Sequence, residues 1–330
     1  ERPPAPGGLS RYFLLCVTVM ELFILGHEHI HADGQRGKLG SGDLYALPNS
    51  YSVTGIYFNT KLAEQLGIDA APTSVEEFEA DMQTAKDAGI LPMMTYAKDG
   101  GTSFVFQALM ANNSSAEDVQ NWILQKSGTF DNQAAQDAAS TLQDWNNKGY
   151  MPEGVNAVDA STALSRFCNG EGLFFPSGNW NLDTVAKALG DDVQFFAFPG
   201  ATSEDEPNVA ANAGAFYGIP VNAKNRDAAA AFLDYTQSAE AQQIIVDNSG
   251  YLPKSSTLDL KANSALQQSM FDAYADVLTS GHTSDFINNA TAGMQSSGLI
   301  PNFQLLLDNS ITPQEFTKNV QAQYDKEAKR

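Results

Sequence analysis

The chain has 330 residues, 43% of them hydrophobic, a length that favours two lobes with their own cores. Its 19 basic and 39 acidic residues give a formal net charge of −20. Because such a surface repels phosphate backbones and anionic membrane faces, nucleic-acid binding is excluded as a function.

The first 42 residues differ in character from the rest. Residues 12–20 are apolar, Glu21 interrupts the run, and residues 22–25 resume it. A secretion signal has a similar apolar region, but no small-residue cleavage site follows this one closely. Cys16 follows a bulky leucine, where a lipid-attachment signal has a small residue. The run is also too short and too interrupted to span a membrane. We interpret residues 1–42 as an atypical, poorly specified leader.

Three of the four histidines, His27, His29 and His31, lie together in this leader. On a strand all three share one face, and on a helix the first and last are neighbours, so either conformation could place nitrogen ligands together. Because no fourth ligand is suggested, we expect no metal site. No other cofactor is expected.

From Asp43 onward, strands alternate with helices, which predicts an α/β fold. Segments rich in β-branched and aromatic residues, or continuously apolar between turn signals, predict strands. These segments are 44–48, 51–58, 90–94, 173–175, 193–198 and 213–220.

Polar residue pairs three positions apart predict where helices begin, because each side chain can bond the other residue's backbone. Such capping boxes are Thr73 with Glu76, Ser114 with Glu117, and Thr312 with Glu315. Apolar residues at helical spacing predict the buried side of each helix. They place Trp122 and Trp145 in the core, and they predict another buried stripe of Ala228, Ala231, Phe232 and Tyr235.

The most informative stretch runs from residue 167 to 182. A helix is expected to end at Asn169-Gly170, a short strand follows, and the turn Ser177-Gly178 leads to Asn179 and Trp180. An indole just past the end of a strand is well placed to face a cleft, where its flat apolar face suits a pyranose ring. A tryptophan in the core is the other interpretation, and this stretch alone leaves both open.

The order of these segments resembles one family. From Asp43 to the end, the chain is similar to the bacterial extracellular solute-binding proteins of sugar ABC importers, the maltose-binding-protein-like group. No single motif is decisive, but their order and spacing are specific. The matching segments are 44–48 before 55–59, 72–78, 167–172 before 177–180, 218–220 before 225–233, and 250–253.

The resemblance implies a two-lobe periplasmic-binding-protein-like fold (type II) that closes around a sugar or oligosaccharide. It implies delivery to the permease subunits of an ABC transporter, a location at the extracellular face of the membrane or in the periplasm, a monomeric state, and no enzymatic activity. Trp180 matches the family's stacking aromatic, and the other residues that it implies as ligand contacts match more loosely. These are Asn179, Tyr51, Ser52, Phe104, Phe106, Gly214, Tyr217, Asn302 and Phe303.

One departure from the family pattern concerns the first lobe. The family begins with a long series of strands and helices, and here only residues 1–42 occupy that place. We therefore expect residues 43–52 and 199–264 to form an incomplete first lobe, and residues 53–198 and 265–330 to form a nearly complete second lobe. A lobe that lacks partner strands exposes edges and apolar surface. This predicts impaired sugar binding by this chain.

Two other functions remain open at this point. A glycoside hydrolase needs two carboxylates at a fixed separation, and 39 acidic residues offer many pairs without favouring any. A non-functional fragment acting only as a scaffold would leave Trp180 buried.

Overall fold

The computed structural model describes residues 46–48, 50–213, 216–252, 260–274 and 282–328. The predictions for the leader, its histidines and Gly214 lie outside these residues. Among the described residues, none of the helices has the length and apolar character needed to cross a bilayer.

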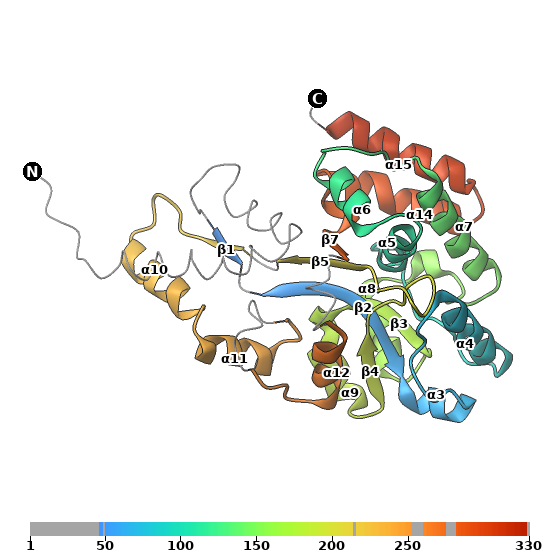
Figure 1. Ribbon diagram of the computed structural model, residues 1–330, viewed down its shortest axis with the longest axis horizontal. Helices are drawn as coiled ribbons and strands as arrows, with labels where there is room; N and C mark the ends of the chain where they lie inside the picture. The colour runs from blue at the N-terminus through green and yellow to red at the C-terminus, as the bar shows by residue number, and fades with distance from the viewer. Residues whose placement is uncertain (1–45, 49, 214–215, 253–259, 275–281, 329–330) are drawn as a thin grey trace, which may run out of the picture.

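The main sheet is organised around strand β2 (Tyr51–Asn59), the long blue arrow at the centre of Figure 1. The C-terminal part of β2 lies between β3 (Phe174–Gly178) and β4 (Val193–Phe196), and both run antiparallel to it. Its N-terminal part pairs with β5 (Val209–Ala213), which pairs in parallel with β7 (Thr283–Ser284). β2 therefore pairs directly with β3, β4 and β5, and β7 joins this sheet through β5.

The alternation of side chains along β2 separates two hydrophobic cores. Ile56 and Phe58 point into one core, whereas Val53 and Tyr57 belong to the other. Successive residues of a strand face opposite sides of the sheet, so the two cores lie on its two faces. Gly55 of β2 lies at a point of close packing. An added Cβ there would lie 2.5 Å from the Oη of Tyr274, a buried tyrosine on α12.

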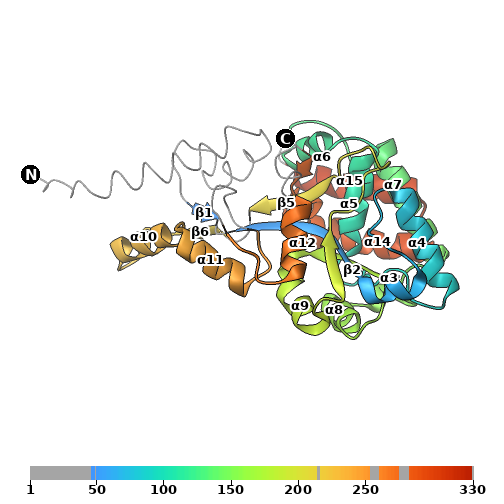
Figure 2. The same cartoon turned by 60° about the horizontal axis from the view of Figure 1, so that its bottom comes forward.

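Helices cover both faces of the sheet (Figures 1 and 2). The larger core includes both tryptophans that the sequence predicts to be internal, since Trp145 and Trp122 are 0% and 3% exposed. The helices of this core are α3 (Thr60–Leu66), α4 (Val75–Asp87), α5 (Thr102–Asn112), α6 (Ala116–Ile123), α7 (Gln133–Asn147), α14 (Ile300–Leu307) and α15 (Pro313–Glu327). The smaller core is covered by α8 (Ala160–Cys168), α9 (Leu182–Leu189) and α12 (Ala265–Tyr274). The described part of the main body also contains the short helical segments η1 (Val155–Ala157), η2 (Asn179–Asn181), η3 (Ile287–Asn289) and η4 (Met294–Leu299).

A smaller part extends away from this main body (Figures 1 and 2). It contains a two-stranded antiparallel sheet of β1 (Ala46–Pro48) and β6 (Phe216–Gly218), together with α10 (Arg226–Tyr235) and α11 (Ala239–Asn248). Its strands and helices belong to the ranges predicted for the first lobe. The boundaries of the two lobes stay a prediction.

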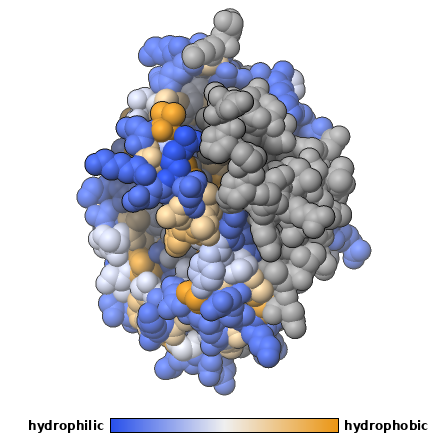
Figure 3. All heavy atoms as spheres, turned by 90° about the vertical axis from the view of Figure 1, so that its left-hand side faces the viewer, coloured by the Kyte–Doolittle hydropathy of each residue, from blue (hydrophilic) through white to orange (hydrophobic). Residues whose placement is uncertain are grey.

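The buried stripe predicted for α10 is wrong. The segment is a helix, but none of its residues is buried, and Phe232 and Tyr235 are 60% and 44% exposed. The helical spacing therefore predicts the helix correctly but not its burial, because α10 lies on the extended part and not on the main sheet. Figure 3 shows apolar patches among polar residues on this side of the molecule.

Two helix starts lie one residue later than predicted. Ser74, and not Thr73, accepts the hydrogen bond from the backbone N–H of Glu77 at 3.1 Å. Ser115 likewise replaces Ser114 as the N-cap of α6. In both places the polar pattern repeats one position along the chain, so the sequence alone cannot separate the two registers.

The last helix begins as predicted, whereas the strand predicted at 90–94 does not form. Thr312 and Glu315 make the reciprocal capping box of α15. In residues 90–94, only an isolated bridge joins Met93 to Phe174 of β3. Pro92 contributes to this difference, because it has no backbone N–H for a strand ladder.

Asp81 on α4 is a partly buried carboxyl group that lies one turn after Glu77. Its removal from water, and secondarily the negative charge of Glu77, raise the pKa of Asp81 to about 6. A raised pKa means that the folded protein holds this proton more tightly than the unfolded chain does.

We therefore predict that Asp81→Asn stabilises the protein only when Asp81 is ionised. The penalty for the charged carboxylate grows as the pH rises from about 4 to 6 and is constant above that range. After solvent screening is allowed for, the gain in Tm at pH 7.5 should be roughly 1–2 °C. Thermal unfolding at pH 4 and pH 7.5 measures it, with Asp87→Asn on the same helix as the control. An equal gain at both values of pH would contradict the prediction.

Candidate functional site

Three aromatic rings that are partly exposed meet at one place on the main body. Phe104 comes from α5, Trp180 from η2, and Phe286 from the segment between β7 and η3. The ring centroid of Trp180 lies 5.6 Å from that of Phe104 and 6.2 Å from that of Phe286, and the two phenylalanine rings are 6.3 Å apart. The planes of the three rings are inclined to one another by 52° to 73°. We call this cluster the ring trio.

Trp180 reaches the ring trio because β3 ends at Gly178, two residues before it. All five residues of β3 are buried, and its last residue, Gly178, accepts a hydrogen bond from the Tyr57 hydroxyl at 2.8 Å. The indole lies over Gly178, where an added Cβ would come 2.0 Å from its Cζ3 atom. Gly178 is therefore the residue that allows the indole to take this position.

Asn179 holds this turn against β2. Its Oδ1 accepts from the backbone N–H of Val53 at 3.1 Å, and its Nδ2 donates to the backbone oxygen of Tyr51 at 2.9 Å. The side chain is 0% exposed. Asn179 is therefore not available to a solute in this structure, which corrects its predicted role as a ligand contact. Its amide instead fixes the turn that carries Trp180.

Phe104 and Phe106 were both candidates, and the structure separates them. Phe104 belongs to the ring trio, whereas Phe106 is 0% exposed and packs against Phe303 and Phe316 at centroid distances of 5.2 Å and 5.4 Å. Phe303 is equally buried, and Asn302, which is 8% exposed, donates to the backbone oxygen of Gly298. Phe106, Phe303 and Asn302 belong to the core, which corrects their predicted contact with a ligand.

The remaining candidates lie elsewhere along the sheets. Tyr51 and Ser52 are partly exposed on β2, opposite Ala213 and Asn212 of β5. Tyr217 lies on β6, in the smaller part, and is 43% exposed. The part of these side chains in binding stays a prediction.

Phe286 is the site residue that sequence reasoning missed. Neighbouring Asp285 is 3% exposed, and its Oδ1 accepts from the backbone N–H of Phe286 at 2.7 Å, from Asn289 at 2.8 Å and from Asn212 at 3.2 Å. No regular helix or strand contains Phe286, so no periodicity signals it. Its membership of the ring trio follows only from its contacts with Phe104 and Trp180 in the structure.

Polar groups lie close along the chain to the rings. Asn181, directly after Trp180, is partly exposed and donates to the Ser177 hydroxyl at 2.9 Å. Burial raises the pKa of the neighbouring Tyr96 to about 12, although a hydrogen bond with Ser177 acts in the opposite direction. Tyr96 therefore stays a neutral hydroxyl at ordinary pH. The surroundings of the rings therefore include the neutral hydrogen-bonding groups of Asn181 and Tyr96 as well as the buried carboxyl group of Asp285.

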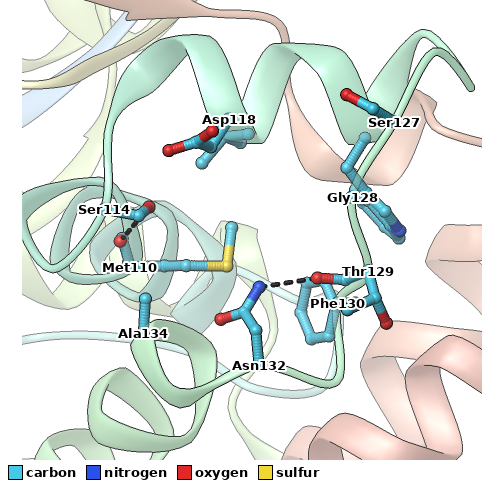
Figure 4. Close-up of a pocket in the computed structure, with 11 residues that line it drawn as sticks. Met110, Ser114, Asp118, Ser127, Gly128, Thr129, Phe130, Asn132 and Ala134 are labelled. Carbon is cyan, nitrogen blue, oxygen red and sulfur yellow. Dashed lines mark hydrogen bonds between the residues drawn. The ribbon is translucent and has the colours of Figure 1, made fainter.

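A separate cavity of about 350 Å³ lies between α6 and residues 127–132 (Figure 4). Met110 and Asn132 face Asp118 across it. The Asn132 amide donates to the backbone oxygen of Thr129, and the Ser114 hydroxyl to that of Met110. Both donors therefore bond backbone oxygens of nearby residues. None of the predicted site residues lines this cavity. No group of three or more His, Cys, Asp or Glu side chains within the described part is placed to hold a metal ion.

The chain belongs to the family of bacterial extracellular solute-binding proteins, whose family model matches residues 31–270. This confirms the family resemblance and the predicted location outside the cytoplasm. A comparison with curated proteins gave no match.

Solved structures are similar in fold. A chitin oligosaccharide binding protein aligns with a TM-score of 0.76 at 21% identity, over 87% of this chain and 72% of that one. RafE in complex with raffinose aligns with a TM-score of 0.73 at 15% identity, over 98% of this chain and 90% of that one. A family 1 extracellular solute-binding protein from Bifidobacterium longum subsp. infantis aligns with a TM-score of 0.69 at 19% identity, over 94% of this chain and 82% of that one. These likenesses confirm the α/β periplasmic-binding-protein-like fold.

We predict that Gly178→Ala displaces the indole of Trp180, because the new methyl group would overlap the six-membered ring. The cost of such overpacking is about 1–3 kcal/mol of unfolding free energy. In protein labelled with 5-fluorotryptophan, the 19F resonance of Trp180, assigned by its loss in Trp180→Phe, should move. The resonances of Trp122 and Trp145 serve as internal controls and should stay in place. An unchanged Trp180 resonance would show that the indole does not lie over Gly178.

Proposed function

We propose that this protein is the carbohydrate-capturing component of an ABC importer and that a sugar ring stacks on the ring trio. The observation that carries the proposal is the position of Trp180, which is partly exposed beside two further rings on a body whose other two tryptophans are buried.

The chemistry of the ring trio suits a carbohydrate. A pyranose has apolar C–H groups on its faces and hydroxyl groups around its edge, so an aromatic face can bury the former while polar side chains bond the latter. Asn181, which follows Trp180, and Asn212, which bonds the buried Asp285, are described amides that could serve this purpose. A hydroxyl left unpaired in such a site costs about 1–3 kcal/mol, so these groups would set the specificity.

The ligands of similar structures support this class of solute. These structures include a chitin oligosaccharide binding protein, RafE in complex with raffinose, and a sugar transporter from Bacillus licheniformis in complex with stachyose. Their sequence identities to this chain are 21% or lower, so the individual sugar does not carry over.

Capture of a sugar would also involve the N-terminal part of β2. Tyr51 and Ser52 lie where β2 pairs with β5, near the point at which the smaller part begins. We propose this junction as the boundary between the lobes, with the division of residues predicted from the sequence. A sugar that contacts both lobes would favour the closed arrangement by its extra affinity for that state, and the closed form would dock on the permease.

We also infer that binding is not followed by hydrolysis. Members of the family are binding proteins, and three apolar rings form the centre of the proposed site. Incubating the protein with each sugar that it binds, followed by chromatography of the solution, tests this inference. Release of shorter saccharides at a rate proportional to protein concentration would overturn it in favour of a hydrolase.

We predict that Trp180→Ala weakens sugar binding at least tenfold, since burial of an aromatic face contributes about 1.5–3 kcal/mol. Phe104→Ala should weaken it less, because this ring supports the indole from one side. Titration calorimetry with raffinose, stachyose, chitin oligosaccharides and galactose measures the effect. Tyr235→Ser, which removes an exposed aromatic ring from α10, is the matched control and should bind like the parent.

Two results would contradict the proposal. One is binding of a sugar with the same affinity by Trp180→Ala and by the parent. The other is an absence of binding to the whole panel at millimolar concentrations of sugar. The weakened binding expected from an incomplete first lobe stays a prediction, and comparisons between variants of this chain do not depend on it.

A further inference from the structure

The segment that carries Phe286 is fixed by two buried glutamine side chains from two different helices. Gln107 of α5 and Gln120 of α6 are 3% and 5% exposed. Gln107 bonds the backbone on both sides of Phe286, and Gln120 bonds it on the N-terminal side, at Asp285. We propose that Gln107 and Gln120 are positioning residues that set the ring of Phe286 in the ring trio. As a statement about sugar affinity, this inference rests on the proposed function.

Gln107 makes most of the contacts. Its Nε2 donates to the Ser284 hydroxyl at 2.9 Å and to the backbone oxygen of Asp285 at 2.7 Å. Its Oε1 accepts from the backbone N–H of Ile287 at 3.0 Å. Both amide hydrogens and the carbonyl oxygen are therefore used, and the bonds lie immediately before and after Phe286.

Gln120 adds one bond on the other side of Asp285. Its Oε1 accepts from the backbone N–H of Asp285 at 2.6 Å. Its Nε2 is buried and has no hydrogen-bond partner among the described residues. Gln120 therefore contributes less than Gln107, and the two variants should rank in that order.

The position of Gln107 along α5 relates its hydrogen bonds to the ring trio. It follows Phe104 by three residues, so the two side chains lie on neighbouring positions of one helical face. α5 thus presents one ring directly and fixes another through the backbone of residues 284–287. The residues next to Gln107 on α5 are apolar and buried, and an amide without partners would be destabilising there. These specific bonds explain why an amide is tolerated there.

A double-mutant cycle separates positioning from general stabilisation of the fold. The variants are Gln107→Met, which keeps the length of the side chain but loses its bonds, Phe286→Ala, and the two combined. If Gln107 acts through Phe286, removing its bonds matters only while that ring is present. If it only stabilises the body, its effect is the same with or without Phe286.

The first readout needs no ligand. In the 5-fluorotryptophan protein, Gln107→Met should move the 19F resonance of Trp180, whose ring neighbours Phe286, and should leave it unmoved in the Phe286→Ala background. Gln120→Met should give a smaller shift of the same kind, and it replaces Gln107→Met if that variant does not fold. A shift that is equal in both backgrounds, or no shift in either, overturns the inference. Gln143→Met is the matched control, because this residue also bonds two backbone oxygens, those of Leu306 and Ile311, but at the end of α14.

The second readout is sugar affinity. Gln107→Met should weaken binding about three- to tenfold in the parent and less than twofold in the Phe286→Ala background. Additive losses overturn the positioning role and leave the proposed function standing. Parent-like affinity of Phe286→Ala overturns the role of Phe286 in sugar binding, and with it any effect of Gln107 and Gln120 on affinity. If the 19F effect is missing but sugar binding is retained, the positioning role has failed and the proposed function stands. If the 19F effect is present but no sugar is bound, the proposed function has failed and the positioning role stands.

Discussion

The site depends on the side chain of one buried asparagine. The amide of Asn179 joins the backbone of β2 at Tyr51 and Val53, and it does so from the residue that precedes Trp180. Gly250 packs against the same turn so closely that a Cβ there would lie 1.9 Å from the backbone oxygen of Asn179. The turn that carries the indole is thus held by β2 and by the close packing of Gly250. A ring held in this way loses little conformational freedom when it binds a ligand.

β2 connects this turn to the rest of the molecule. Its C-terminal part separates the two hydrophobic cores, and its N-terminal part pairs with β5 where the smaller part of the molecule begins. Asn212 of β5 bonds Asp285, and Asp285 in turn bonds the backbone of Phe286. The three rings therefore take their positions from a strand turn, a helix and a loop that all meet near one end of the sheet.

The sequence predicts the class of fold, most helices and two of the three rings, because these depend on local patterns and on the family resemblance. It cannot separate Phe104 from Phe106, although the helix does so, since residues two positions apart point about 200° away from each other. It misses Phe286 because that ring is placed by long-range bonds from Gln107 and Gln120. It also cannot show that the amide of Asn179 is used within the protein, since an asparagine beside an exposed ring could bond either a ligand or the backbone.

The measurement that tests this account most directly is a sugar titration of the 5-fluorotryptophan protein followed by 19F NMR. The account predicts that the resonance of Trp180 moves and saturates with added raffinose, stachyose or chitin oligosaccharide, whichever is bound. The resonances of buried Trp122 and Trp145 should move far less. Heat of sugar binding in the calorimeter with no change at Trp180 would contradict the account, because the solute would then bind away from the ring trio.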